Sequence, residues 1–243
     1  MKTFFNQPLL NPNHDVKSIK EEFEKNRVVV IKNFLNPIIA ERLHTWFTEE
    51  MPKDWWRISS YPKLDGGEGF DLIPFSDDFS DDIRQMYTHS ISSFKDNKFS
   101  YNFHRTINDH NDTCDCFECG FRESITNDEI LKFLNAITGQ GLTDTDEGLG
   151  AVYLPGDFLS PHQDSPNGTL GFTLQLTKNW KPQFGGNLHF MDGPNGEVEK
   201  IVVPSFNTLT IFDLPKGVGK WHYVSTVSPG VEELRLTYAG WYK

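Results

Sequence analysis

From about residue 149 to the C-terminus, the chain consists of short apolar runs separated by Gly, Pro, Asn and Asp. The runs are AVYL, LGFTLQLT, NLHFMD, EKIVVP, TLTIFDL, WHYVSTV and LRLTYAGWY. They are rich in β-branched and aromatic residues and too short for typical helices, so the pattern predicts seven or eight strands. Strands at this spacing favour a sandwich or jelly roll, with two buried inner faces and a mouth for a small ligand.

The first 148 residues have a different pattern, which predicts mostly helices and loops that support this β core. We expect a short helix at 15–26, a strand in RVVVIKNFL, and a helix that begins at Asn36 and Pro37. Residues 60–80 mix Gly, Pro and Asp with apolar residues, which predicts a long loop that could act as a lid. The chain is therefore expected to be one domain, 1–243, mainly β with flanking helices.

Two further helices are predicted before the β-rich part. The residues Ile83, Met86, Tyr87, Ile91 and Phe94 recur at helical spacing. Thr126 and Glu129 have the spacing of a capping box, and Gly139 has the position of a C-terminal cap. Both helices are interpreted as structural.

Charge and cysteine content limit the partners and the compartment. The formal net charge is -11, with 23 Lys and Arg against 34 Asp and Glu, which argues against a nucleic-acid-binding surface. The longest apolar runs are far shorter than the roughly 20 residues that span a bilayer. Three cysteines within six residues do not resemble a disulfide framework. We therefore expect a soluble cytoplasmic protein with no membrane partner.

The chain contains two His-x-Asp pairs, and only one of them is followed by further candidate ligands. His162 and Asp164 end the stretch YLPGDFLSPHQD, and His222 follows in the later run KWHYVSTV. Two imidazoles and one carboxylate can occupy one face of an octahedral ion and leave three positions open, as in non-haem Fe(II) oxygenases. The other pair, His110 and Asp112, has no such continuation and is rejected as the iron pair.

Arg235 follows His222 in another predicted strand, LRLTYAGWYK. A guanidinium fixed near a metal can bind the far carboxylate of a dicarboxylic acid through two hydrogen bonds. Between the two histidines, Gly185 and Gly186 would let the chain turn tightly or approach another backbone.

The order Y-x-P-G-D-F-L-x-x-H-x-D, then W with GG-x-L, then H, then R-L-x-x-x-G-W-Y resembles the prolyl-4-hydroxylase-like branch of the 2-oxoglutarate/Fe(II)-dependent oxygenases. The resemblance covers roughly residues 149–243 and implies a double-stranded β-helix. It implies His162, Asp164 and His222 as iron ligands and Arg235 as the partner of the distal carboxylate of 2-oxoglutarate. Tyr153 matches a tyrosine that hydrogen-bonds this co-substrate, and Trp241 matches an aromatic residue at the substrate mouth.

The resemblance also implies the reaction. Such an enzyme uses Fe(II), 2-oxoglutarate and O2, is typically stimulated by ascorbate, and hydroxylates an unactivated C–H bond with succinate and CO2 as co-products. Because Asp164 is present, hydroxylation is expected rather than chlorination. A prolyl residue in a protein or peptide is the first substrate hypothesis. A free amino acid or small metabolite, and a non-catalytic metal-binding or sensing module, are the alternatives.

The cysteine cluster allows two interpretations. His110, Cys114, Cys116 and Cys119 could close a tetrahedral Zn site, although the C-x-C step is tighter than a common zinc knuckle. A loop of thiols without metal is the alternative, and it is favoured because the cluster is entirely local. Under either interpretation the cluster is not expected to be the catalytic centre.

Overall fold

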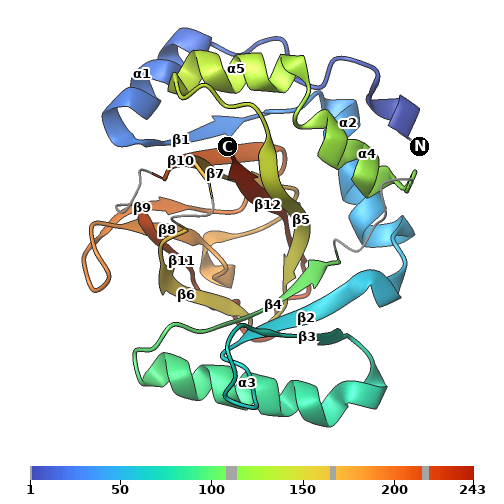
Figure 1. Ribbon diagram of the computed structural model, residues 1–243, viewed down its shortest axis with the longest axis vertical. Helices are drawn as coiled ribbons and strands as arrows, with labels where there is room; N and C mark the ends of the chain where they lie inside the picture. Colours follow the sequence, from blue (N-terminus) through green and yellow to red (C-terminus); the bar gives the residue numbers. More distant parts are fainter. Residues whose placement is uncertain (1, 108–113, 165–167, 215–218) are drawn as a thin grey trace.

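The computed structural model describes residues 2–107, 114–164, 168–214 and 219–243 (Figure 1). At its centre, antiparallel strands form a curled sheet that closes into a barrel-like jelly roll with helices around it. This architecture confirms the predicted fold class, a mainly β jelly-roll core with flanking helices.

The strands and helices have the following bounds. The strands are β1 Val28–Lys32, β2 Trp56–Tyr61, β3 Asp71–Pro74, β4 Tyr101–Thr106, β5 Thr145–Tyr153, β6 Phe158–His162, β7 Leu170–Gln175, β8 Leu188–Met191, β9 Val198–Val202, β10 Thr208–Asp213, β11 Trp221–Val224 and β12 Arg235–Tyr242. The α-helices are α1 Val16–Asn26, α2 Pro37–Thr45, α3 Ser80–Lys95, α4 Phe117–Ser124 and α5 Asp128–Thr138. Short 3-10 or π turns are η1 Lys2–Phe5, η2 Trp46–Glu50, η3 Lys53–Trp55, η4 Asp77–Phe79 and η5 Pro182–Phe184.

The sheet folds into two facing layers. One layer has the strand order β1-β10-β7-β12-β5, and the other has the order β6-β11-β8-β9. Strand β4 joins them, because its first residues, Tyr101 and Asn102, pair with β6 while His104 and Arg105 pair with β5. Strands β2 and β3 extend this join. The interior between the layers is therefore open at one end, which is where a ligand site can form.

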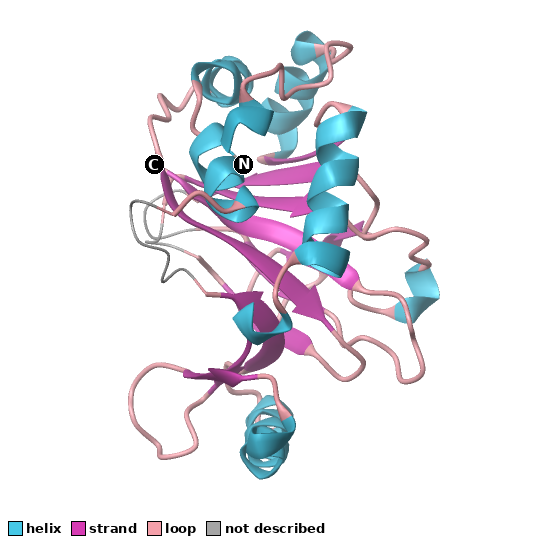
Figure 2. Ribbon diagram, turned by 90° about the vertical axis from the view of Figure 1, so that its right-hand side faces the viewer, coloured by secondary structure: helices cyan, strands magenta, loops and turns pink. Residues whose placement is uncertain are grey.

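Helices cover the outer face of the larger layer. Figures 1 and 2 show α1, α2, α4 and α5 on this side, whereas α3 lies apart from them, against β2 and β4. Strand β12 shows how the sequence separates the two faces. Leu236, Tyr238 and Tyr242 point into the apolar layer beneath the helices, while the alternating residues point into the barrel. Among the described residues, no helix is both long and apolar enough to span a membrane.

The structure corrects the prediction that the first 148 residues are helices and loops. Strand β1 was predicted in RVVVIKNFL, but three further strands, β2 to β4, also lie in that part and belong to the same sheet as the C-terminal strands. The predicted long loop at 60–80 is also shorter than expected, because 71–74 pairs with 57–60 as a hairpin. Pairing of β3 with β2, and of β2 with β4, stabilises these two short strands, although the Gly, Pro and Asp residues nearby give little local strand signal.

The predicted helices are present, but one cap differs. Asn36 accepts a hydrogen bond from the Ile38 N–H, and Gly139 ends α5 in the left-handed region. The capping box at Thr126 and Glu129 is wrong, since Asn127 caps α5 through the Ile130 N–H. The Glu129 carboxylate instead accepts hydrogen bonds from the backbone of the N-terminal segment, at Leu9 and Leu10.

Candidate active site

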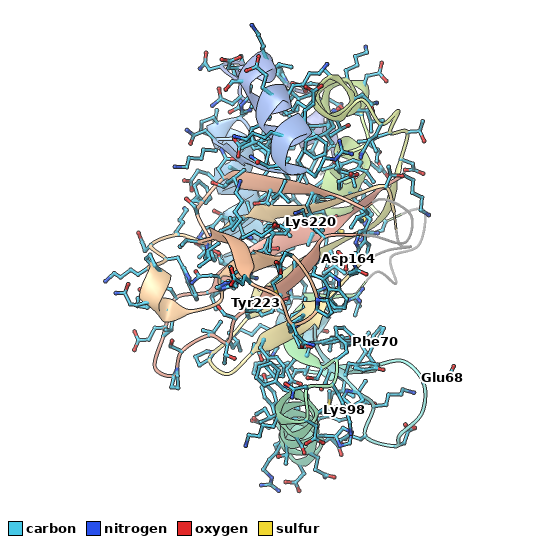
Figure 3. All side chains as sticks on the ribbon, turned by 90° about the vertical axis from the view of Figure 1, so that its left-hand side faces the viewer. Glu68, Phe70, Lys98, Asp164, Lys220 and Tyr223 are labelled. Carbon is cyan, nitrogen blue, oxygen red and sulfur yellow. The ribbon has the colours of Figure 1, made fainter. Side chains whose placement is uncertain are left out.

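A cavity of about 860 Å³ opens between the two sheet layers. It receives the inward residues of β12 and β5, and it contains His162, Asp164, His222 and Arg235. Nine Phe, Tyr and Trp side chains contribute to its wall: Phe70, Phe99, Tyr101, Phe103, Tyr153, Phe172, Phe212, Trp221 and Trp241. Figure 3 shows Asp164 and Phe70 on the same side of the molecule, with Glu68 at the outer end of the loop that carries Phe70.

Strand pairing brings the two histidines together. His162 ends β6 and lies directly opposite His222 of β11, so their ring centroids are 4.2 Å apart. Asp164 follows β6 by two residues and approaches both rings, with 3.2 Å from Oδ1 to His162 Nε2 and 3.4 Å from Oδ2 to His222 Nε2. One ligand atom from each residue lies within 4.8 Å of the others. The structure thus brings together the three residues that the sequence grouped.

Hydrogen bonds fix which nitrogen of each ring faces the centre. The Nδ1 of His162 lies 2.9 Å from the Ser160 carbonyl oxygen, and the Nδ1 of His222 lies 2.9 Å from that of Lys220. Because a carbonyl oxygen only accepts, each Nδ1 must donate. In the neutral rings, both Nε2 lone pairs then face the Asp164 carboxylate.

Three converging acceptor groups repel one another unless a positive charge lies among them. Burial alone would raise the pKa of Asp164, but the neighbouring histidines hold it well below its ordinary value. Burial likewise opposes a charged His222, yet the Asp164 carboxylate raises the pKa of this ring overall. The donor set, two imidazoles and one carboxylate with an open side toward the cavity, fits a divalent iron ion.

Arg235 is a buried cation whose side chain lacks a counter-ion in the described part of the chain. Its Nε donates to the Gly186 carbonyl oxygen, while its Nη1 is buried without a hydrogen-bond partner among the described residues. Burial lowers the pKa of Arg235 to about 10, so the guanidinium remains charged at neutral pH. A buried, partly unsatisfied guanidinium is costly unless an anion pairs with it. The site therefore fits one end of a dicarboxylate.

The two glycines predicted to permit close approach have that role here. Gly185 and Gly186 both have positive φ, at 71° and 61°. A Cβ on Gly185 would lie 2.1 Å from the Thr226 carbonyl oxygen, and one on Gly186 would lie 2.8 Å from Cδ of Arg235. The glycine pair therefore lets the backbone of this turn pack closely against the Arg235 side chain, whose Nε donates to the Gly186 carbonyl oxygen.

Tyr153 and Trp241 also line the cavity. Tyr153 lies opposite Arg235 in the β5–β12 pairing, and the guanidinium carbon is 4.2 Å from the centre of its ring. Phe103 stacks on the Tyr153 ring at 5.2 Å. Trp241 lies on the same face of β12 as Arg235, six residues along, and is half-buried.

Sequence reasoning missed two hydroxyl groups in this cavity. The Oγ1 atoms of Thr237 and Thr173 are buried without a hydrogen-bond partner among the described residues. Thr237 lies two positions after Arg235 on one strand, and alternate strand residues share a face, so this spacing could have indicated it. Thr173 lies on β7, and only the three-dimensional pairing places it here.

The cysteines lie elsewhere. Cys114, Cys116 and Cys119 do not line the cavity, and they gather at the start of α4 on the helical side of the sheet. His110, the fourth member of the predicted zinc site, and the rejected pair His110/Asp112 lie outside the described residues. The cysteine cluster is therefore separate from the cavity that contains His162, Asp164 and His222.

Comparison with known proteins finds a family match in the C-terminal part of the chain. The sequence model of the 2OG-Fe(II) oxygenase superfamily matches residues 149–243. The match covers the C-terminal β-rich part of the chain. The matched region contains His162, Asp164, His222 and Arg235, and the superfamily uses Fe(II), 2-oxoglutarate and O2. No curated protein matches this chain.

Solved structures with a similar fold cover nearly all of this chain. A prolyl-4-hydroxylase from Pseudomonas putida has 16% identity and a TM-score of 0.54, with 94% of this chain and 98% of that chain covered. A 2OG-Fe(II) oxygenase family oxidoreductase from Burkholderia pseudomallei has 11% identity, a TM-score of 0.58, and coverage of 93% and 91%.

A third similar structure is a prolyl hydroxylase from Trichoplax adhaerens in complex with a peptide fragment of the hypoxia inducible factor oxygen degradation domain. It has 15% identity and a TM-score of 0.55, and 93% of this chain and 88% of that chain are covered. At such identities the three likenesses establish the shared fold. The superfamily match over residues 149–243 supports the predicted enzyme class, a 2-oxoglutarate/Fe(II)-dependent dioxygenase.

Proposed function

We propose that this oxygenase hydroxylates a prolyl residue in a protein or peptide. The observation that carries the proposal is the aromatic cavity, which begins at the His162/Asp164/His222 cluster and reaches exposed side chains at its rim. About 860 Å³ lies near the upper end of small-molecule sites, so room remains beside a bound dicarboxylate. Aromatic-lined grooves also suit the flat, apolar proline ring.

The cavity offers binding residues for both the iron ion and 2-oxoglutarate. His162 Nε2, His222 Nε2 and Asp164 would bind Fe(II), and Arg235 with Thr237 would hold the distal carboxylate of 2-oxoglutarate. When bound, iron and 2-oxoglutarate supply the oxidising power for C–H hydroxylation, with succinate and CO2 as co-products. The apolar wall excludes water from this reaction and orients the substrate.

The rim favours a substrate larger than a free amino acid. Phe70 and Leu72, at the end of the 62–70 loop and the start of β3, are each 40% exposed although they line the cavity. Phe99, also 40% exposed, packs against His162 with ring centroids 5.5 Å apart. Apolar side chains left in water at the mouth can bury surface on a peptide that extends beyond the cavity. The Trichoplax prolyl hydroxylase, which has this fold, was solved in complex with a peptide fragment.

The test is turnover by the purified protein with Fe(II), 2-oxoglutarate and ascorbate. Substrates are proline-containing peptides, the same peptides with Pro replaced by Ala, and free proline and other amino acids. We expect succinate release and a gain of one oxygen only with the proline-containing peptides, and no release by Asp164→Ala. Turnover confined to a free amino acid would instead support the metabolite hydroxylase.

The rim can be tested separately. Phe70→Ala should raise the KM for peptide several-fold, corresponding to about 1 kcal/mol of lost apolar burial, without changing the KM for 2-oxoglutarate. The matched control is Phe75→Ala, since Phe75 is 53% exposed in the same segment but packs on His104 outside the cavity lining. Equal effects of both substitutions would contradict a binding role for the rim.

A further inference from the structure

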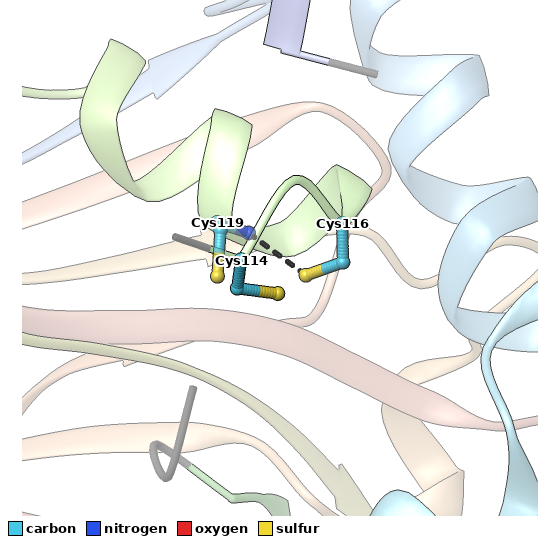
Figure 4. A group of neighbouring side chains, drawn as sticks. All are labelled: Cys114, Cys116 and Cys119. Atoms are coloured by element: carbon cyan, nitrogen blue, oxygen red, sulfur yellow. Dashed lines mark hydrogen bonds between the residues drawn. The ribbon is translucent and has the colours of Figure 1, made fainter. Parts of the chain in front are cut away.

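The chain's only cysteines form a compact group away from the oxygenase cavity. Cys116 and Cys119 are buried, Cys114 is half-buried, and none of the three is in a disulfide. Their sulfur atoms all lie within 4.8 Å of one another. Figure 4 shows the three side chains turned toward a common space beneath the first turn of α4. Nothing in the oxygenase reaction uses this group.

The sulfur spacing is close to that of a metal–thiolate site. Zn–S bonds of about 2.3 Å at tetrahedral angles place pairs of sulfurs about 3.8 Å apart, so the observed group needs shifts below about 1 Å. All three side chains come from one six-residue segment, C-x-C-x-x-C, whose second half has the C-x-x-C spacing of zinc knuckles. We propose that Cys114, Cys116 and Cys119 bind one thiophilic cation, Zn2+, with a fourth ligand from outside these three residues.

Burial raises the pKa of the Cys116 and Cys119 thiols, but positive groups lie close to the sulfurs. The Cys119 N–H donates to Cys116 Sγ at 3.4 Å, and Cys116 is the N-cap of α4, where the helix dipole is positive. One turn along α4, Arg122 adds a cation that interacts with Cys119 and with the buried Glu118. Three thiolates and one Zn2+ carry a net charge of -1, which this cation offsets.

The position of the cluster suggests a structural role. Cys116 and Cys119 lie in the apolar layer between α4 and the sheet, where Phe121 of α4 packs edge-on against Tyr238 of β12. Cys114 belongs to the segment that follows β4, the strand that supplies Phe103 to the cavity wall. A bound ion would therefore link Cys114, in the segment after β4, to the first turn of α4. Metal binding would add to the folding free energy of this short segment.

The oxygenase site complicates a metal titration, because His162, Asp164 and His222 can also bind Zn2+. We would therefore titrate the Asp164→Ala variant with Co2+ as a spectroscopic probe. Thiolate–Co2+ bonds give intense near-ultraviolet charge-transfer absorption, which ligation by imidazole and carboxylate does not. The expected result is one equivalent of Co2+ with this absorption, displaced by one equivalent of Zn2+.

Two further variants test whether the Co2+ absorption comes from the cysteines or from the His162/Asp164/His222 cluster. Adding Cys114→Ser to Asp164→Ala should remove most of the near-ultraviolet absorption, and Cys114 is chosen because it is the least buried of the three. The control, His162→Ala alone, should retain it. Far-ultraviolet circular dichroism checks that each variant is folded.

A second measurement needs no cysteine substitution, so a misfolded variant cannot account for its result. In the unaltered chain, Zn2+ should protect all three thiols from alkylation, as measured by mass spectrometry. The proposal is overturned if Asp164→Ala gives no charge-transfer absorption and its three thiols alkylate equally fast with and without Zn2+. It is also overturned if the purified chain contains a Cys116–Cys119 disulfide in place of bound metal.

Discussion

The two faces of β12 have different roles, one in stability and one in ligand binding, although their residues alternate along one strand. Leu236, Tyr238 and Tyr242 are buried beneath the helices, where they join the larger apolar layer. Arg235 and Thr237 are equally buried on the other face, but they carry polar atoms without partners among the described residues. One face stabilises the fold, whereas the other keeps unsatisfied groups that a ligand can satisfy. Substitutions on the two faces should therefore separate stability from activity.

Arg235→Ala should have the largest effect on co-substrate use. Removing one partner of a buried charge pair costs about 2–5 kcal/mol, so the KM for 2-oxoglutarate should rise by about 30-fold or more. Metal binding should be largely unaffected, because Arg235 is not in the metal cluster. Steady-state succinate release against 2-oxoglutarate concentration measures this. Arg235→Lys, which retains the charge, is the matched control, and its KM for 2-oxoglutarate should lie between those of the unaltered chain and Arg235→Ala. An unchanged KM in Arg235→Ala would show that Arg235 does not bind the co-substrate.

Leu236→Ala tests the opposite face one residue along. Leu236 is fully buried among apolar neighbours, so its truncation should lower the free energy of unfolding by about 2–5 kcal/mol. Urea denaturation measures the loss, and the KM for 2-oxoglutarate should be unchanged at temperatures where the variant is folded. Val198→Ala on β9, where Val198 is 42% exposed, should change stability by less than about 0.5 kcal/mol. If Leu236→Ala raised the KM for 2-oxoglutarate and left the free energy of unfolding unchanged, this face would serve co-substrate binding and not stability.

Thr237→Val should have the smallest effect. It replaces an unpartnered hydroxyl with a methyl group, so the lost hydrogen bond to co-substrate costs about 1 kcal/mol, or roughly a five-fold rise in KM. The free energy of unfolding should remain the same or rise, since a buried unsatisfied group is removed. Thr237→Ser retains the hydroxyl and should keep the KM near its original value. If valine leaves the KM unchanged, the hydroxyl does not contact the co-substrate.

The sequence predicted those parts of the fold that depend on local pattern. The strand runs after residue 149, the N-cap at Asn36 and the αL cap at Gly139 follow from periodicity and backbone preference alone. The strand β6, which carries His162, was not separated from the loop around it, because Pro161 interrupts its pattern. Strands β2 and β3 were missed because they depend on pairing that the local sequence does not show: β3 pairs with β2, and β2 pairs with β4.

The candidate site divides in the same way. His162, Asp164, His222 and Arg235 could be grouped from the sequence because few residue types bind metals or carboxylates, and their order is distinctive. The pairing of His162 with His222 across β6 and β11 then explains why residues far apart in sequence meet. Thr173 and the rim at Phe70 carry no such signature, because threonine and phenylalanine are common in strands and loops. Only the folded chain places them in the cavity.

The most direct test of the central claim is Mn2+ binding without oxygen chemistry. Mn2+ prefers oxygen and imidazole ligands over thiolates, so it reports on the His162/Asp164/His222 cluster and not on the cysteines. We predict that the unaltered chain binds one equivalent, more tightly with 2-oxoglutarate present, and that Asp164→Ala and His222→Ala lose this binding. Equal Mn2+ affinity and equal succinate release by His222→Ala and the unaltered chain would contradict the account.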